Sequence, residues 1–448
     1  MCPAGLFCAR PGMAGINGRA SGFDGKVPCT QALTGSHEEV SVKVIFIAAG
    51  LLGWSISLPI QTEQGADASK NQPGAPQQST PPQNRSTPQS PPAPLSTPPV
   101  TGPLQPAPPI SIDGGPLGKL SLNGVLSGIG LVQTDHTAGD SSSEAALSGA
   151  QIFVQKADGW WQFYVQAGAY DILSLGMPFL STDKQITDLY GPVPVAYLKL
   201  APAKNTSIQI GALPTLMGLE YTFDFENMNI ERGLLWTQEN AINRGIQVNQ
   251  TVGKFTASFS WNDGYYSNRY SWLSGSLTYT NGPHSLLFAG MGNLGHTAFQ
   301  TLATPVQNNS VMYALEYSCT KGNWIAQSYY QYSKVPTDPA VGIPKGASTQ
   351  SGAALLSSKL GHGFSLAGRG EYIATTGSAM GGAQNLLYGP GSSAWSATVT
   401  PAFQRQRFFV RGDASVVRAI SFTPGNAFGK AGTDSTQARG VLEIGFLF

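Results

Sequence analysis

The chain has little charge. Asp, Glu, Lys and Arg make up 11% of its 448 residues, whereas a typical soluble domain has about 25%. The apolar fraction, 41%, is not raised in exchange, and the polar half is filled by 54 glycines and by Ser, Thr, Asn and Gln, with 16 Tyr and 20 Phe. A transmembrane β-barrel needs this mixture, because one face of each strand meets lipid while the other meets water. A secreted β-sandwich can also be charge-poor, so composition supports a barrel without deciding for it.

The sequence also lacks an excess of basic residues, and its predicted mature part lacks a pair of cysteines. The net charge of +1 provides no basic patch for nucleic acid, which excludes that class of partner. Three of the four cysteines lie within the first 29 residues, ahead of any plausible mature start, and Cys319 remains alone. It shares the apolar face of its segment with Tyr313 and Leu315. We therefore expect a small apolar side chain and no internal disulfide.

Catalytic motifs are missing as well. The chain contains no G-x-S-x-G, no H-E-x-x-H and no Walker loop. The pair His284-Ser285 could suggest a lipid-hydrolysing dyad, but His284 falls in the turn Asn281-Gly-Pro-His, where a polar residue needs no further explanation. The sequence predicts no enzyme, no cofactor and no metal site.

Long apolar runs are absent too. The run that follows Lys43 has about eleven residues, which is too short for a spanning helix and typical of a secretory signal. We predict a signal peptide at 42–68, with an A-x-A site at Ala66–Ala68, and a non-native extension at 1–41 from a misplaced start codon. The Pro, Gln, Ser and Thr of 69–118 predict a disordered periplasmic linker.

From residue 119 to the end, short alternating runs are separated by Gly, Asn, Asp and Pro clusters. In Lys254–Asn262, for example, Phe255, Phe259 and Trp261 share one face, opposite Ser260. We predict an all-β, antiparallel up-and-down barrel over 119–448 whose even strand number leaves no edge unpaired in lipid. About sixteen strands are expected to start near 119, 146, 160, 192, 206, 244, 254, 270, 284, 310, 323, 349, 363, 393, 405 and 438.

The intervals between these strands alternate in length. Tight links such as Asn281–His284 and Gly361–Gly363 predict periplasmic turns. The longer, more polar intervals predict external loops at 174–190, 217–243, 295–309, 335–348, 376–392 and 419–437.

The C-terminal strand has two distinct faces. Phe448, Phe446, Ile444 and Leu442 lie on the face suited to lipid, and the opposite face carries Arg439 and Glu443. A terminal aromatic residue on such a strand resembles the closing strand of bacterial outer-membrane barrels. We predict that these four residues are the signal that the barrel-assembly machinery reads. The alternative is a buried last strand of a soluble sheet.

The interval 217–243 is rich in acidic residues, and basic residues lie on the polar faces of two predicted strands. Acid on an inward loop facing a basic ladder would set up a transverse field at a pore constriction. The alternative is a solvated outer loop, with the arginines paired locally to Asp413 and Glu443. The predicted constriction acids are Glu220, Asp224, Glu226 and Glu231, and the predicted pore-lining bases are Arg405, Arg407, Arg411 and Arg369.

The same region carries a family resemblance. Ordered matches occur at 195–202, 208–220, 227–232, 244–248 and 259–265. They include a Leu-Pro-Thr run leading to Gly-Leu-Glu, an Asn-Met-Asn motif and an Asn-Asp-Gly turn, and over 119–448 the chain resembles the OmpL-like β-barrel porin family. It departs from that family's pattern at Ala212, where a Lys is expected. The resemblance implies an outer-membrane channel of unassigned substrate.

These features together predict an outer-membrane porin of a Gram-negative-type bacterium. It would be a passive diffusion channel for small hydrophilic solutes or ions, in contact with outer-membrane lipid and with the barrel-assembly machinery. A homotrimer and a monomer are both compatible with the sequence. The alternative function is a non-channel surface or anchor protein of the outer membrane, such as an adhesin.

Overall fold

The computed structural model describes residues 102–298 and 305–448. The predicted extension 1–41, the predicted signal peptide 42–68 and the predicted linker as far as residue 101 lie outside the described residues. Within the described ranges, no helix is long and apolar enough to cross a membrane.

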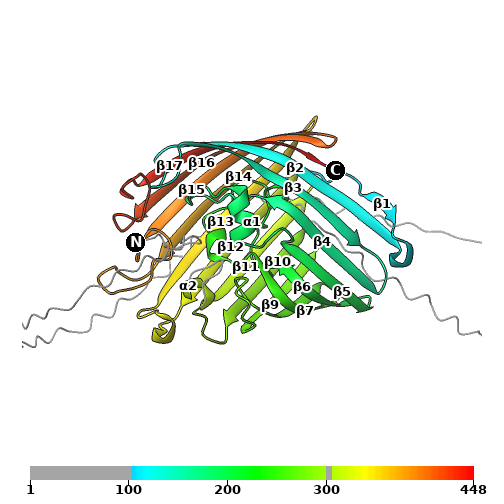
Figure 1. Cartoon of the computed structure of the whole chain (residues 1–448), viewed down its shortest axis with the longest axis horizontal. Helices are drawn as coiled ribbons and strands as arrows, with labels where there is room; N and C mark the ends of the chain where they lie inside the picture. Colours follow the sequence, from blue (N-terminus) through cyan, green and yellow to red (C-terminus); the bar gives the residue numbers. More distant parts are fainter. Residues whose placement is uncertain (1–101, 299–304) are drawn as a thin grey trace, which may run out of the picture. The chain divides into compact units, whose positions relative to one another are not determined.

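Sixteen antiparallel strands form one barrel (Figure 1). Their predicted starts agree with the observed ones to within three residues, so the predicted strand number and order are confirmed. The strands are β2 Lys119–Gln133, β3 Ser143–Lys156, β4 Trp161–Tyr170, β5 Val195–Ala203, β6 Thr206–Pro214, β7 Ile242–Val252, β8 Phe255–Asn262, β9 Trp272–Asn281, β10 His284–Asn293, β11 Val311–Lys321, β12 Trp324–Val335, β13 Ala347–Gly361, β14 Phe364–Thr375, β15 Ser393–Arg405, β16 Phe408–Ser421 and β17 Thr436–Leu447.

The barrel closes where β17 pairs with β2. Their register runs from Arg439 opposite Gln133 to Leu447 opposite Val125, and the two strands lie side by side in Figure 1. Closure lets the backbone groups of every strand pair with a neighbouring strand. In a bilayer this is required, because lipid cannot satisfy an open strand edge.

The connections alternate between tight turns and long loops. In the turn between β13 and β14, both residues have positive φ, 52° at His362 and 86° at Gly363, as in a type I′ turn whose twist suits a hairpin. The other end of the barrel has the six long intervals expected from the sequence and two further loops, at 134–142 and 263–271. These two loops are short, and the sequence pattern did not identify them.

The outer surface is apolar as the alternation predicts. On β8, Phe255, Phe259 and Trp261 are each about half exposed, whereas Ser260 and Asn262 are buried. The same order holds on other strands, and Cys319 lies on the outward face of β11, as expected. This belt of aliphatic and aromatic side chains suits the hydrocarbon core of a membrane.

The end of the predicted linker is ordered, which corrects the expectation of a disordered segment as far as residue 118. A short strand, β1 (Ile110–Asp113), pairs with Lys119–Leu122 of β2, and a 3-10 turn at Gly115–Leu117 joins them. The physical reason is that β2 extends past the end of β17. The first residues of β2 therefore have no partner in β17. β1 covers this otherwise open edge.

Candidate pore constriction

The longest loop, residues 215–241 between β6 and β7, folds into the lumen; we call it the inner loop. Nearly all of its side chains from Phe223 to Gln238 are buried, including Ile230, Leu235 and Trp236. A surface loop would leave these apolar groups in water, and their burial is a main reason for the loop to turn inward. Short 3-10 turns at Asp224–Glu226 and Trp236–Gln238 make it compact.

One side of the inner loop packs on aromatic residues of strands β3 to β5, which we call the aromatic wall. Phe223 meets Tyr170 edge to face, with ring centroids 5.3 Å apart, and Phe225 lies 5.4 Å from Phe153. All four rings belong to one buried apolar cluster. The contacts on this side therefore involve loop side chains.

The other side of the inner loop meets charged residues on strands β14 to β17, which we call the charged wall. The Asp413 Oδ2 atom accepts hydrogen bonds from the backbone N–H groups of Ile230 and Glu231, both at 2.9 Å. The Arg411 Nη1 atom donates to the Asn227 carbonyl at 3.0 Å, and Glu371 accepts from the Leu234 N–H at 3.0 Å. The wall thus holds the main chain of the loop.

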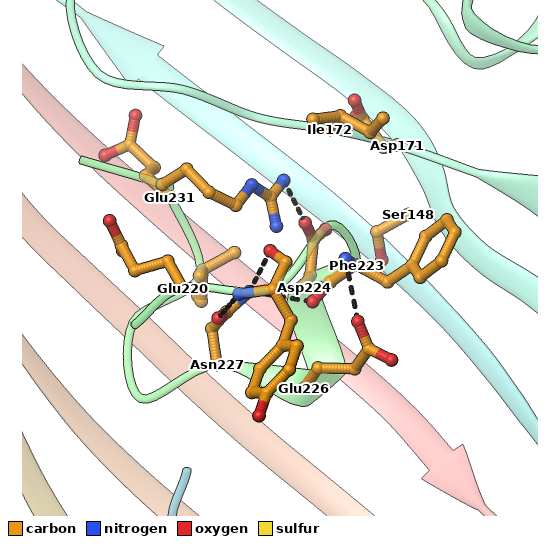
Figure 2. A network of polar contacts seen from close by, with 12 residues as sticks. Ser148, Asp171, Ile172, Glu220, Phe223, Asp224, Glu226, Asn227 and Glu231 are labelled. Carbon is orange, nitrogen blue, oxygen red and sulfur yellow. Dashed lines mark hydrogen bonds and ion pairs between the residues drawn. The ribbon is translucent and has the colours of Figure 1, made fainter. Parts of the chain in front are cut away.

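The four acids expected at a constriction all lie on the inner loop and are buried. Figure 2 shows their side chains pointing in different directions from the loop. Glu220 pairs with Arg369, Asp224 lies 2.5 Å from Arg232, and Glu231 lies 3.2 Å from Arg439. Glu226 instead accepts the Phe223 N–H at 3.1 Å. Three of the four carboxylates therefore meet an arginine at contact distance.

Burial changes the acidity of loop carboxyls. It raises the pKa of Glu226 to about 8, although the Phe223 N–H and the charge of Arg232 oppose the shift. Burial also raises the pKa of Glu239, with a further rise from the nearby charge of Glu316. Near neutral pH the Glu226 carboxyl therefore holds a proton that an exposed carboxyl would release.

Of the four expected bases, the structure brings two into the lumen. Arg369 on β14 and Arg411 on β16 point inward and are buried, and the Arg411 Nε atom lies 3.0 Å from Glu443 Oε2. Arg405 and Arg407 are exposed, at the tight turn from β15 to β16. The prediction of one ladder was wrong for them, because the turn interrupts the alternation and even-numbered residues face inward on β15.

Buried acids were also missed, among them Glu316 and Glu239. Glu316 on β11 accepts the Gly218 N–H at 2.7 Å, and Glu239 accepts from the Gln331 Nε2 atom at 2.8 Å. Alternation could have found Glu316, since it opposes Leu315 and Tyr317. Glu239 lies in a loop and had no such signal. In the described ranges, no group of three or more His, Cys, Asp or Glu could hold a metal ion.

The C-terminal strand has the orientation expected of it. Leu442, Ile444 and Phe446 face outward and are about half exposed, while Glu443 is buried in the lumen. Phe448 exchanges two backbone hydrogen bonds with Gly124 of β2, at 2.6 and 2.9 Å. Its role as an assembly signal stays a prediction.

Solved structures and one family model are similar to this chain. No curated protein matches it. OmpT of Vibrio cholerae, expressed in the outer membrane, is 10% identical over 74% of this chain and 98% of its own, with a TM-score of 0.49. OmpF of Salmonella typhi, in complex with daunomycin, is 13% identical over 76% of this chain and 100% of its own, with a TM-score of 0.48. The model of the family described as "Putative beta-barrel porin-2, OmpL-like" matches residues 119–448, and the chain therefore belongs to this porin family.

Proposed function

We propose that this porin, in the outer membrane of a Gram-negative-type bacterium, passes small hydrophilic solutes by diffusion and favours cations over anions. The observation that carries the preference is an excess of buried acid over buried base. Among the described residues, twelve acidic and five basic side chains are buried. Charge on a pore lining favours ions of the opposite sign.

The inner loop is the element that we propose as the constriction. It fills lumen space between the aromatic and charged walls, and its backbone is fixed by Asp413, Glu371 and Arg411. A fixed loop narrows a sixteen-stranded barrel that would otherwise leave a wide aqueous channel. Because Glu220, Asp224, Glu226 and Glu231 are buried, we expect them to act on passing ions through their electric field.

Membership of a porin family and the barrel fold favour a channel over an enzyme. A homotrimer is a further proposal, which cross-linking in detergent micelles would test. Contact with outer-membrane lipid follows from the apolar belt of the barrel.

Ion selectivity in planar bilayers tests the cation preference. Glu226 and Glu239 are suited to substitution, since both are buried acids of the inner loop that accept hydrogen bonds, and Gln keeps an accepting oxygen. We expect the Glu226→Gln, Glu239→Gln double variant to have a lower potassium-to-chloride permeability ratio than the wild type at about pH 9, above the pKa of about 8 that burial gives Glu226.

The matched control is Asp188→Asn, which removes one exposed acid from the helix α1 (Thr182–Asp188). Its permeability ratio should equal that of the wild type. A double variant that keeps the wild-type ratio would show that the buried acids do not set selectivity. A wild-type barrel without conductance steps would contradict the channel itself.

A further inference from the structure

The segment that precedes the barrel, residues 102–109, enters the lumen from the end with the tight turns; we call it the strap. Its first three residues are buried. Leu104 is 1% exposed and belongs to the apolar cluster that contains Val125, Phe409 and Phe225. Val125 and Phe409 face inward from β2 and β16, and Phe225 belongs to the inner loop. The strap therefore fills space between wall and loop.

Polar side chains of the barrel hold the backbone of the strap. The Gln105 N–H donates to Gln404 Oε1 at 2.7 Å, and the Gln404 Nε2 atom donates to the Gln105 carbonyl at 2.8 Å. The Asn123 Nδ2 atom donates to the Ala107 carbonyl at 3.1 Å. Gln404 and Asn123 lie on β15 and β2, so the strap bridges two sides of the seam where the barrel closes.

The strap also touches the inner loop directly. A Cβ atom at Gly102 would lie 2.1 Å from the Asn227 carbonyl oxygen, which means that the two backbones pack with no room for a side chain. The same carbonyl accepts the hydrogen bond from Arg411. The Asn227 carbonyl group of the inner loop therefore contacts both the strap and Arg411 of the charged wall.

We propose that the strap is an autoinhibitory element: docked, it narrows the lumen below the inner loop, and released, it leaves a wider channel. The proposal rests on the channel function above. Docking rests on the buried residues 102–104 and on three hydrogen bonds to backbone atoms, whereas the barrel has its full set of strand pairs without these contacts. The strap can therefore detach while the barrel stays folded.

Single-channel conductance of the full chain tests the inhibition. Leu104→Asp places a carboxylate in the apolar cluster and should release the strap, giving a several-fold larger conductance than the wild type. Pro106→Asp is the matched control, because it adds the same charge two residues away at an exposed position, and it should keep the wild-type conductance. Gln404→Ala, which removes two of the strap's hydrogen bonds, should increase conductance in the same direction but by less.

Thiol labelling tests docking without reference to conductance. In a chain whose four cysteines are replaced by serine, the variant Leu104→Cys should react with a charged maleimide much more slowly than the variant Pro106→Cys. Equal rates would overturn the docked strap. Slow labelling at 104 together with unchanged conductance in Leu104→Asp would overturn the inhibition, and a wild type and variants that never conduct would contradict the channel as well.

Discussion

The aromatic wall and the charged wall enclose the same loop in different ways. On the aromatic wall, rings such as Tyr170 and Phe153 meet loop side chains. On the charged wall, Asp413 and Arg411 meet loop N–H and carbonyl groups. The first kind of contact depends on which side chains the loop carries. The second fixes where its main chain runs, alongside the ion pairs that Arg369 and Arg439 form with loop carboxylates.

The two kinds of contact also differ in strength and direction. Hydrogen bonds to charged groups contribute about 1.5–3 kcal/mol each and need defined geometry. Aromatic pairs add about 0.5–1.5 kcal/mol beyond the area that they bury and tolerate several orientations. We infer that the charged wall sets the position of the inner loop, while the aromatic wall supplies apolar burial that stabilises it.

The largest effect is expected for Arg369→Met on the charged wall. This change removes the partner of Glu220 and the donor to the Glu231 carbonyl, 2.6 Å from Nη1. Removing one member of a buried ion pair costs about 3–5 kcal/mol, because the other charge is left without compensation. Urea unfolding of the barrel in lipid vesicles should show a loss of free energy of unfolding in this range.

The double variant Arg369→Met, Glu220→Gln is the control for this prediction. It removes the charge of Glu220 as well but leaves Glu371, 3.3 Å from Arg369 Nε in the wild type, so it should recover only part of the lost stability. If the double variant is no more stable than Arg369→Met alone, the ion pair does not hold the loop and the charged wall loses its assigned role.

A smaller effect is expected for Asp413→Asn. The carboxylate accepts two loop N–H groups through Oδ2 and the Thr400 hydroxyl through Oδ1, at 2.6 Å. An amide has only one accepting oxygen, so at least one bond to a charged acceptor is lost, at about 1.5–3 kcal/mol. The same unfolding measurement applies, and the exposed Asp188→Asn should change stability by less than about 0.5 kcal/mol. Equal losses in both variants would contradict the prediction.

The sequence predicted the barrel well, because strand alternation is local. It also placed Arg369 and Arg411 inward, as observed. It failed for Arg405 and Arg407, because alternation is not preserved through a turn. It left open whether the inner loop folds inward, since that depends on Asp413 and Glu371, which lie more than a hundred residues further along the chain.

The sequence also failed to predict the position of the strap, for a different reason. Residues 102–109 are rich in proline, and that composition is typical of a solvated spacer. Nothing local indicates that Leu104 would join the apolar cluster of Phe225 in the lumen. The contact arises because closing the barrel places the start of β2 beside the inner loop, which is a property of the whole fold.

An intermediate effect is expected from pH. Glu226, between the two walls, has a pKa raised to about 8 by burial. A carboxyl is neutral below its pKa and negative above it, so increasing the pH from about 6 to about 9 adds negative charge to the lumen. The potassium-to-chloride permeability ratio should rise over this range and rise less in Glu226→Gln. An identical pH dependence in both proteins would assign the titration to another group.

The smallest effect is expected on the aromatic wall. Tyr164→Phe keeps the ring contacts, with Tyr197 at 5.8 Å and Phe153 at 6.5 Å, and loses only the hydroxyl bond to Gln166 Oε1 at 2.9 Å. The expected cost is about 0.5–1.5 kcal/mol in urea unfolding. Ring burial, which we assign as this wall's contribution, is unchanged by the substitution. A loss as large as that of Arg369→Met would mean that the aromatic wall also positions its neighbours through polar contacts, and the distinction between the two walls would not hold.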